Sequence, residues 1–163
     1  MSLRLTEDAA SFFSKIDSQP IKGVRFLDID KFYACLMLGF RYAQLASDPS
    51  LMPAFLAAGA KYPDAYQPYD SYLLGLLVEA EIRRRNLDPK NRDLIEQETV
   101  KLLDPHSPLG LSEDGIRFMN RYAAKGFEIL RDAMAPPRSV DDFLVAYADL
   151  WQAKSEPDSG QPA

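Results

Sequence analysis

The sequence is poor in the side chains that build metal centres and disulfides, with one cysteine and one histidine among 163 residues. Cys35 has no second cysteine with which to form an intramolecular disulfide, and His106 has no histidine or cysteine near it. Because zinc sites need three or four such ligands, we expect neither a metal site nor a bound cofactor. Cys35 falls in the most apolar stretch and His106 in a proline-flanked turn, so we expect a core residue and a solvated loop residue.

Long apolar runs and an excess of basic residues are also missing. The longest strongly apolar run, ACLMLGF at 34–40, is far shorter than the ~20 residues needed to span a bilayer. The first residues lack the basic segment and apolar stretch of a signal peptide. The formal net charge of −5 disfavours nucleic acid as the main ligand. We therefore expect a soluble, cytoplasmic protein with no membrane partner.

Alternation of apolar and polar residues with period two does not continue anywhere for long enough to build a sheet. Apolar residues instead recur at spacings of three and four, which is typical of helices packed on one face. The sequence predicts an all-α fold, an irregular or orthogonal bundle of about six helices in a single domain over 1–152. Residues 21–27 are a candidate short extended segment, and 153–163 are expected to be a disordered tail.

Helix starts are marked by hydroxyl and acidic residues. Thr6 and Ser112 are predicted N-caps of helices over 6–17 and 112–134, and each is followed by Glu-Asp, which suits the helix dipole. Gly126 lies in the apolar stripe of the second of these and should let another helix approach closely. Ser139 is expected to cap the last helix, with Phe143 and Leu144 on its inner face.

Three helices are predicted between these. One runs from Asp28 or Asp30 to about Ala46 and is apolar nearly all round, so it should be central. The next covers about 69–86. A third begins with Asp88 as N-cap and Pro89 as first helical residue and ends near Leu103. Prolines at 49, 53, 63 and 68 predict a loop between the first two of these helices.

The stretch FLDIDKFYA, 26–34, carries two aspartates that could hold a magnesium ion on a phosphate. Its letters from Asp28 to Ala34 resemble the first palm motif of Y-family translesion DNA polymerases, and SVDDF at 139–143 resembles their second acidic motif. The resemblance implies a metal-binding Asp28 and a sugar-screening Tyr33. It covers about a dozen residues, and the region between the two motifs is predicted helix broken by prolines. We therefore favour Asp28 and Asp30 as helix-capping residues.

Two clusters are candidate contact surfaces. Half of the eight tyrosines, namely Tyr62, Tyr66, Tyr69 and Tyr72, fall in or just after the proline-rich loop. Tyrosine is common in protein interfaces because its ring supplies area while its hydroxyl tolerates water. The alternative is a loop that lies flat on the core. The second cluster is Arg83, Arg84 and Arg85, which is either a phosphate-binding patch or a salt-bridged helix end.

No catalytic constellation is apparent, so the leading hypothesis is a non-enzymatic helical protein that binds another protein. It would act as a self-associating homo-oligomer or as an accessory subunit of a larger complex. The alternative is an accessory protein that binds nucleic acid through Arg83–Arg85. A third hypothesis is metal-dependent phosphoryl or nucleotidyl chemistry at Asp28 and Asp30.

Overall fold

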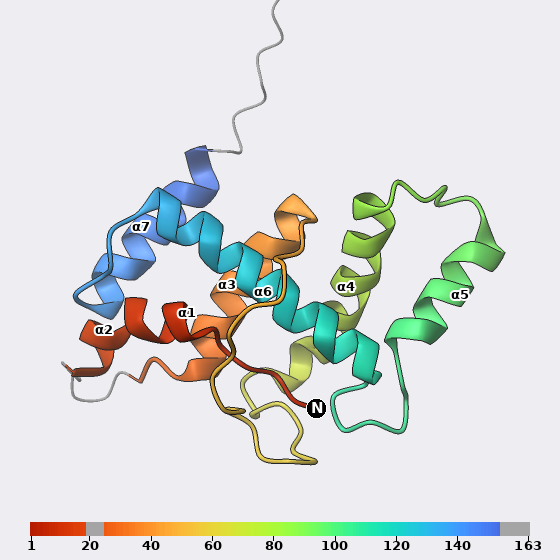
Figure 1. Ribbon diagram of the computed structural model, residues 1–163, viewed down its shortest axis with the longest axis horizontal. Coiled ribbons are helices and arrows are strands. Elements are labelled where there is room, and N and C mark those ends of the chain that lie inside the picture. The colour runs from red at the N-terminus through yellow and green to blue at the C-terminus, as the bar shows by residue number, and fades with distance from the viewer. Residues whose placement is uncertain (19–24, 154–163) are drawn as a thin grey trace, which may run out of the picture.

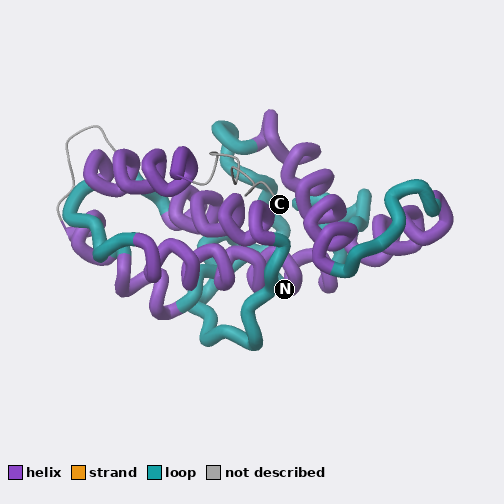
Figure 2. The backbone as a smooth tube through the Cα atoms, turned by 90° about the horizontal axis from the view of Figure 1, so that it is seen from above, coloured by secondary structure: helices purple, strands orange, loops and turns teal. Residues whose placement is uncertain are grey.

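The computed structural model describes residues 1–18 and 25–153, and in this part of the chain it is built from helices and loops without a strand (Figures 1 and 2). The helices are α1 (Glu7–Phe12), α2 (Ser14–Ser18), α3 (Asp28–Tyr42), the 3₁₀ helix η1 (Gln67–Tyr69), α4 (Asp70–Arg84), α5 (Arg92–Leu102), α6 (Glu113–Ala133) and α7 (Val140–Ala153). The prediction of an all-α fold is confirmed.

Helices α3 and α6 cross at the centre of the molecule and pack against each other more extensively than any other pair of elements described (Figure 1). Nine of the fifteen residues of α3 are buried, which confirms the prediction that it is the central helix. Helix α6 is the longest described, and its buried stripe includes Met119, Tyr122, Phe127 and Leu130.

Two glycines set the distance between these helices. A Cβ atom added to Gly126 would overlap the carbonyl oxygen of Cys35 and lie 2.8 Å from the backbone nitrogen of Gly39. A Cβ atom added to Gly39 would in turn overlap the carbonyl oxygen of Tyr122. The two backbones therefore meet where neither residue has a side chain, which confirms the close approach predicted for Gly126.

Helices α1, α2 and α7 lie on one side of this crossing (Figure 1). Aromatic rings join the N-terminal segment to α7 there. Phe13 packs edge-on against Phe12 and Phe143, with ring centroids 5.2 Å and 5.3 Å apart. Phe12 also packs edge-on against Phe127 of α6 at 5.4 Å. Edge-to-face pairs of this kind add to the stabilisation that buried area gives. Phe143, the buried residue of α7, thus anchors this helix to the N-terminal segment.

Helices α4 and α5 lie on the opposite side of the α3–α6 crossing (Figure 1). Helix α4 packs Leu73, Leu77 and Ala80 inward. Its end is a left-handed turn at Asn86, with φ of 51° and a hydrogen bond from the Leu87 N–H to the Ile82 carbonyl. Asparagine tolerates this conformation better than most residues, which explains why the helix stops there.

The N-caps predicted at Thr6, Ser112 and Ser139 are in place, whereas Leu27, and not Asp28 or Asp30, is the N-cap of α3. The hydroxyl oxygens of Thr6, Ser112 and Ser139 accept hydrogen bonds from the backbone N–H groups of Ala9, Gly115 and Asp142 at 3.0–3.1 Å. Each such cap contributes about 1 kcal/mol by satisfying an N–H group at the helix end. The near-identical starts of α1 and α6 are therefore the same capping chemistry used twice.

Three boundaries differ from the prediction. Helix α5 begins at Arg92 with Asn91 as its cap, because Asp88 closes a turn by accepting the Lys90 N–H at 2.9 Å. The helix predicted over 6–17 breaks at Phe13, which separates α1 from α2. Helix α3 stops at Tyr42 because Ala43 is left-handed, with φ of 47°.

The prediction for the inner face of α7 is wrong at Leu144, which is exposed, because α7 meets the core mainly through Phe143. Residues 25–27 of the candidate extended segment are irregular, and its residues 21–24 lie outside the described residues. The tail beyond Ala153 also lies outside them. None of the described helices combines the length and apolar character needed to cross a bilayer.

We expect Gly126→Ala to lower the free energy of unfolding by about 3 kcal/mol, since the methyl group must push the backbones of α3 and α6 apart. Urea denaturation of the purified protein measures this. Gly75→Ala is the matched control, because Gly75 lies on α4 with open space around its Cβ position. That control should gain roughly 0.5–1 kcal/mol from helix propensity. Equal effects of the two substitutions would contradict the close crossing.

Candidate functional site

The four clustered tyrosines do not share one surface. Tyr62 is 4% exposed, and its hydroxyl has no hydrogen-bond partner among the described residues. Burial, together with the nearby Asp70 carboxylate, raises the pKa of Tyr62. The prediction of a contact role does not fit Tyr62, because its ring belongs to the core. The loop that carries it lies on the core, as the alternative interpretation expected.

Tyr66 fastens the same loop to the start of α3. Its hydroxyl donates to one carboxylate oxygen of Asp30, and its ring lies 5.4 Å from that of Tyr33. The other carboxylate oxygen of Asp30 accepts the Leu27 N–H at 2.7 Å. The pKa of Tyr66 is raised, mainly by burial and secondly by the hydrogen bond to Asp30. Tyr66 therefore has a structural partner already.

Tyr69 and Tyr72 remain accessible, with 52% and 71% of their surface exposed. Leu76, one turn further along α4, is 36% exposed. Tyr69 ends η1 directly before α4, and the spacings of three and four residues place Tyr69, Tyr72 and Leu76 along one side of the helix. This side adjoins the buried side that carries Leu73 and Leu77. We call this surface the α4 outer face. Glu79 and Arg83 continue it and form an ion pair at 2.6 Å.

The predicted arginine cluster is held by partners within the chain. Arg83 donates to the carbonyl oxygens of Phe40 and Arg41, the latter at 3.0 Å. These carbonyls lie in the last turn of α3, where the Phe40 oxygen also accepts the Ala43 N–H, and the cation of Arg83 complements the negative end of the helix dipole. Arg85 pairs with Glu98 of α5.

Arg84 belongs to a network around Glu81, whose side chain is 1% exposed. Arg84 donates twice to Glu81 at 2.8 Å, and the Tyr122 hydroxyl donates to it at 2.6 Å. Burial alone would raise the pKa of Glu81, but the hydrogen bonds from Arg84 and Tyr122 outweigh it and lower the pKa. The network joins α4 to α6. All three arginines thus have acidic or carbonyl partners, which leaves them poorly placed to bind a phosphate backbone.

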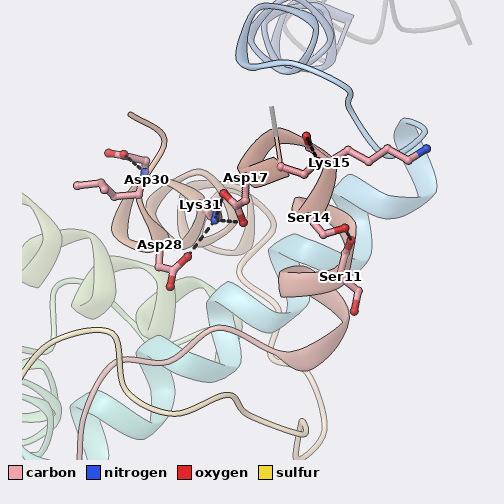
Figure 3. Close-up of polar contacts among 9 residues, drawn as sticks. Ser11, Ser14, Lys15, Asp17, Asp28, Asp30 and Lys31 are labelled. Atoms are coloured by element: carbon pink, nitrogen blue, oxygen red, sulfur yellow. Dashed lines mark hydrogen bonds and ion pairs between the residues drawn. The ribbon is translucent and has the colours of Figure 1, made fainter. Parts of the chain in front are cut away.

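The two aspartates of the 26–34 motif, Asp28 and Asp30, bind different partners. Lys31 is 3% exposed, and its ammonium nitrogen lies 2.9 Å from carboxylate oxygens of both Asp17 and Asp28 (Figure 3). Asp30 points away from this group (Figure 3). Its carboxylate instead accepts hydrogen bonds from the Leu27 N–H and the Tyr66 hydroxyl. Burial alone would lower the pKa of Lys31, but its bonds to Asp17 and Asp28 raise it. The motif starts α3 and ties α2 to it.

No cluster of three or more metal-ligating side chains occurs in residues 1–18 and 25–153. Cys35 is buried, and burial raises the pKa of its thiol to about 12, so the reactive thiolate is disfavoured. His106 is exposed in the turn before α6.

Sequence reasoning missed the structural roles of Lys31, Glu81 and Arg83. Glu81 falls four residues after Leu77 and therefore on the buried stripe of α4, which is the signal that could have identified it. Lys31 lies three residues after Asp28 in a helix that is otherwise apolar. The contact of Arg83 with the end of α3 joins residues more than forty positions apart, and no local pattern indicates it.

No protein-family model matches the chain, and neither a curated protein nor a solved structure resembles it. Any proposal about function therefore depends on the chain's own residues.

We expect Glu81→Gln to lower the free energy of unfolding by about 2 kcal/mol at pH 7, since hydrogen bonds to a charged group are lost in a buried site. The folded-state pKa of Glu81 is lowered, so its contribution is complete above the ordinary value of 4.5 and is lost as pH falls through the folded-state pKa. The difference between wild type and variant should therefore shrink in acid. Urea denaturation across this pH range measures it.

The matched control is Glu79→Gln, which removes a carboxylate from an exposed ion pair on the same helix. It should cost less than about 1 kcal/mol at any pH. A Glu81→Gln penalty that stays constant into acid would show that the carboxylate is not ionised in the folded protein.

Proposed function

We propose that this protein acts by self-association, with the α4 outer face of one copy packed against the α4 outer face of a second copy. The observation that carries the proposal is the exposure of Tyr69, Tyr72 and Leu76 on one helical face. Aromatic residues are enriched at protein interfaces, where their rings bury area at low entropic cost. Exposed apolar side chains grouped on one helix mark interaction sites more often than scattered ones do.

The charge pattern of α4 favours a second copy as the partner. The helix begins with Asp70 and ends with arginines, and its outer face is apolar at the start and charged at the end. A two-fold axis near Leu76 would place the two α4 helices antiparallel. Tyr69 would then lie beside Arg83 of the second copy, and Tyr72 beside its Glu79. A ring over a guanidinium group and a hydroxyl beside a carboxylate are both favourable contacts.

Antiparallel pairing also opposes the dipoles of the two α4 helices, because the positive start of each lies against the negative end of the other. Gly75, which has open space around its Cβ position, lies next to Leu76 and lowers the steric barrier to a second helix. A parallel arrangement would bring like ends together and is disfavoured.

We expect the wild-type protein to sediment as a dimer in analytical ultracentrifugation, and Tyr72→Asp to sediment as a folded monomer. Tyr72 lies in the first turn of α4, where an acidic residue suits the helix dipole, so the substitution should not unfold the protein. The new carboxylate would lie beside Glu79 of the second copy, so two negative charges would have to lose water in the proposed interface.

Val100→Asp is the matched control, since Val100 is equally exposed but lies on α5. It should remain a dimer. A wild-type protein that is monomeric up to its solubility limit would overturn self-association. Dissociation by Val100→Asp with Tyr72→Asp still dimeric would place the interface elsewhere.

A further inference from the structure

A groove of about 320 Å³ lies where the first residues of the chain run alongside α6, on a different part of the molecule from the α4 outer face. Its lining includes the arginines Arg4, Arg117 and Arg121, together with Asp48 and Leu51. Cavities of this size fall at the lower end of those that hold small molecules.

The backbone around the groove is fixed by a buried asparagine. Asn120, which is 5% exposed, accepts the Arg4 N–H at 2.9 Å and donates to the Ser2 carbonyl at 3.0 Å. Leu3 and Leu5 are buried, and successive side chains of an extended segment alternate between its faces, so Arg4 is directed away from the core. Arg4 is thereby held next to the turn of α6 that carries Arg117 and Arg121.

Donors remain unused in this groove. Among the described residues, the Arg4 guanidinium has neither an ion pair nor a hydrogen bond. Arg121 uses its Nε to reach the Ala46 carbonyl at 2.8 Å, which leaves its terminal nitrogens. Arg117 bonds through one terminal nitrogen to Asp114 at 2.6 Å.

The local charge is positive in an acidic protein. Three guanidinium groups and the carboxylates of Asp48 and Asp114 leave an excess of one positive charge at the groove, whereas the chain as a whole has a net charge of −5. Arg117 and Arg121 are four residues apart on α6, a spacing at which like charges repel. An anion between them would relieve this repulsion.

We propose that this groove binds a small molecule that carries a phosphate group on a short apolar body. Arginines from the N-terminal segment and from α6 line the same groove, and their guanidinium groups offer several donors to a phosphate dianion. Leu51 and Pro49 supply an apolar wall for the rest of the ligand. The two parts of the site thus require both a charged and an apolar group in the same molecule.

Phenyl phosphate is a suitable probe. Benzoate replaces its phosphate with a carboxylate, and inorganic phosphate lacks its ring. A ¹H–¹⁵N NMR titration at low ionic strength should shift amide signals of Arg4, Asp48 and 117–121. We expect phenyl phosphate to bind at least about tenfold more tightly than benzoate, because charge-assisted bonds to a dianion are stronger. Inorganic phosphate should bind more weakly than phenyl phosphate, because it leaves the apolar wall unfilled.

Arg4→Gln should weaken phenyl phosphate binding by about tenfold or more, the effect of losing a charge-assisted contact. The backbone bond to Asn120 does not depend on the side chain, so the variant should fold. Arg138→Gln is the matched control, since it removes the same charge from an exposed position in the loop between α6 and α7, and its affinity should stay within twofold.

Equal binding of benzoate and phenyl phosphate would overturn the phosphate assignment. Equal losses of affinity in Arg4→Gln and Arg138→Gln would show that binding depends only on the overall charge of the protein. Amide shifts centred outside the groove, or no shifts with any probe, would show that the groove is not a binding site. The Tyr72→Asp protein should bind phenyl phosphate as wild type does, so this test is independent of self-association.

Discussion

The contact between the backbones of α3 and α6 at Gly39 and Gly126 is the constraint on which the rest of the structure depends. Because each glycine faces a carbonyl oxygen of the other helix, the two helices approach more closely than side chains would permit. This proximity buries Cys35, Met119 and Tyr122 between them. The other helices then pack on the two sides of a fixed cross, α1, α2 and α7 on one and α4 and α5 on the other (Figure 1).

Charged side chains hold those outer helices to the cross. Lys31 ties α2 to α3 through Asp17, Glu81 ties α4 to α6 through Tyr122, and Arg83 closes the end of α3. A buried ion pair costs desolvation and is tolerated only when its hydrogen bonds are satisfied, as they are here. Lys31 and Glu81 are therefore not free to bind ligands, whereas the Arg83 side chain is 43% exposed and can still contact an aromatic ring. The surfaces left for function are those with exposed rings or unused guanidinium donors.

Local patterns were sufficient for the helical class, the caps at Thr6 and Ser112, and the close approach at Gly126, since each depends on residues within a turn or two. They were insufficient wherever distant segments compete for a residue. Tyr62 belongs to a tyrosine cluster that is typical of protein interfaces, but its ring is buried in the core. The arginines at 83–85 form a basic run in sequence, yet their partners come from α3, α4 and α5. The groove at Arg4 joins segments over a hundred residues apart, so no sequence pattern could indicate it.

Native-state hydrogen exchange tests the central role of the α3–α6 contact most directly. The slowest amides should be those of α3 near Cys35–Gly39 and of α6 near Tyr122–Gly126, exchanging only through global unfolding, while α5 opens at lower free energy. The same order of protection should hold at low protein concentration. A protected core centred on α4 and α5, with α3 and α6 exchanging independently of each other, would contradict the account.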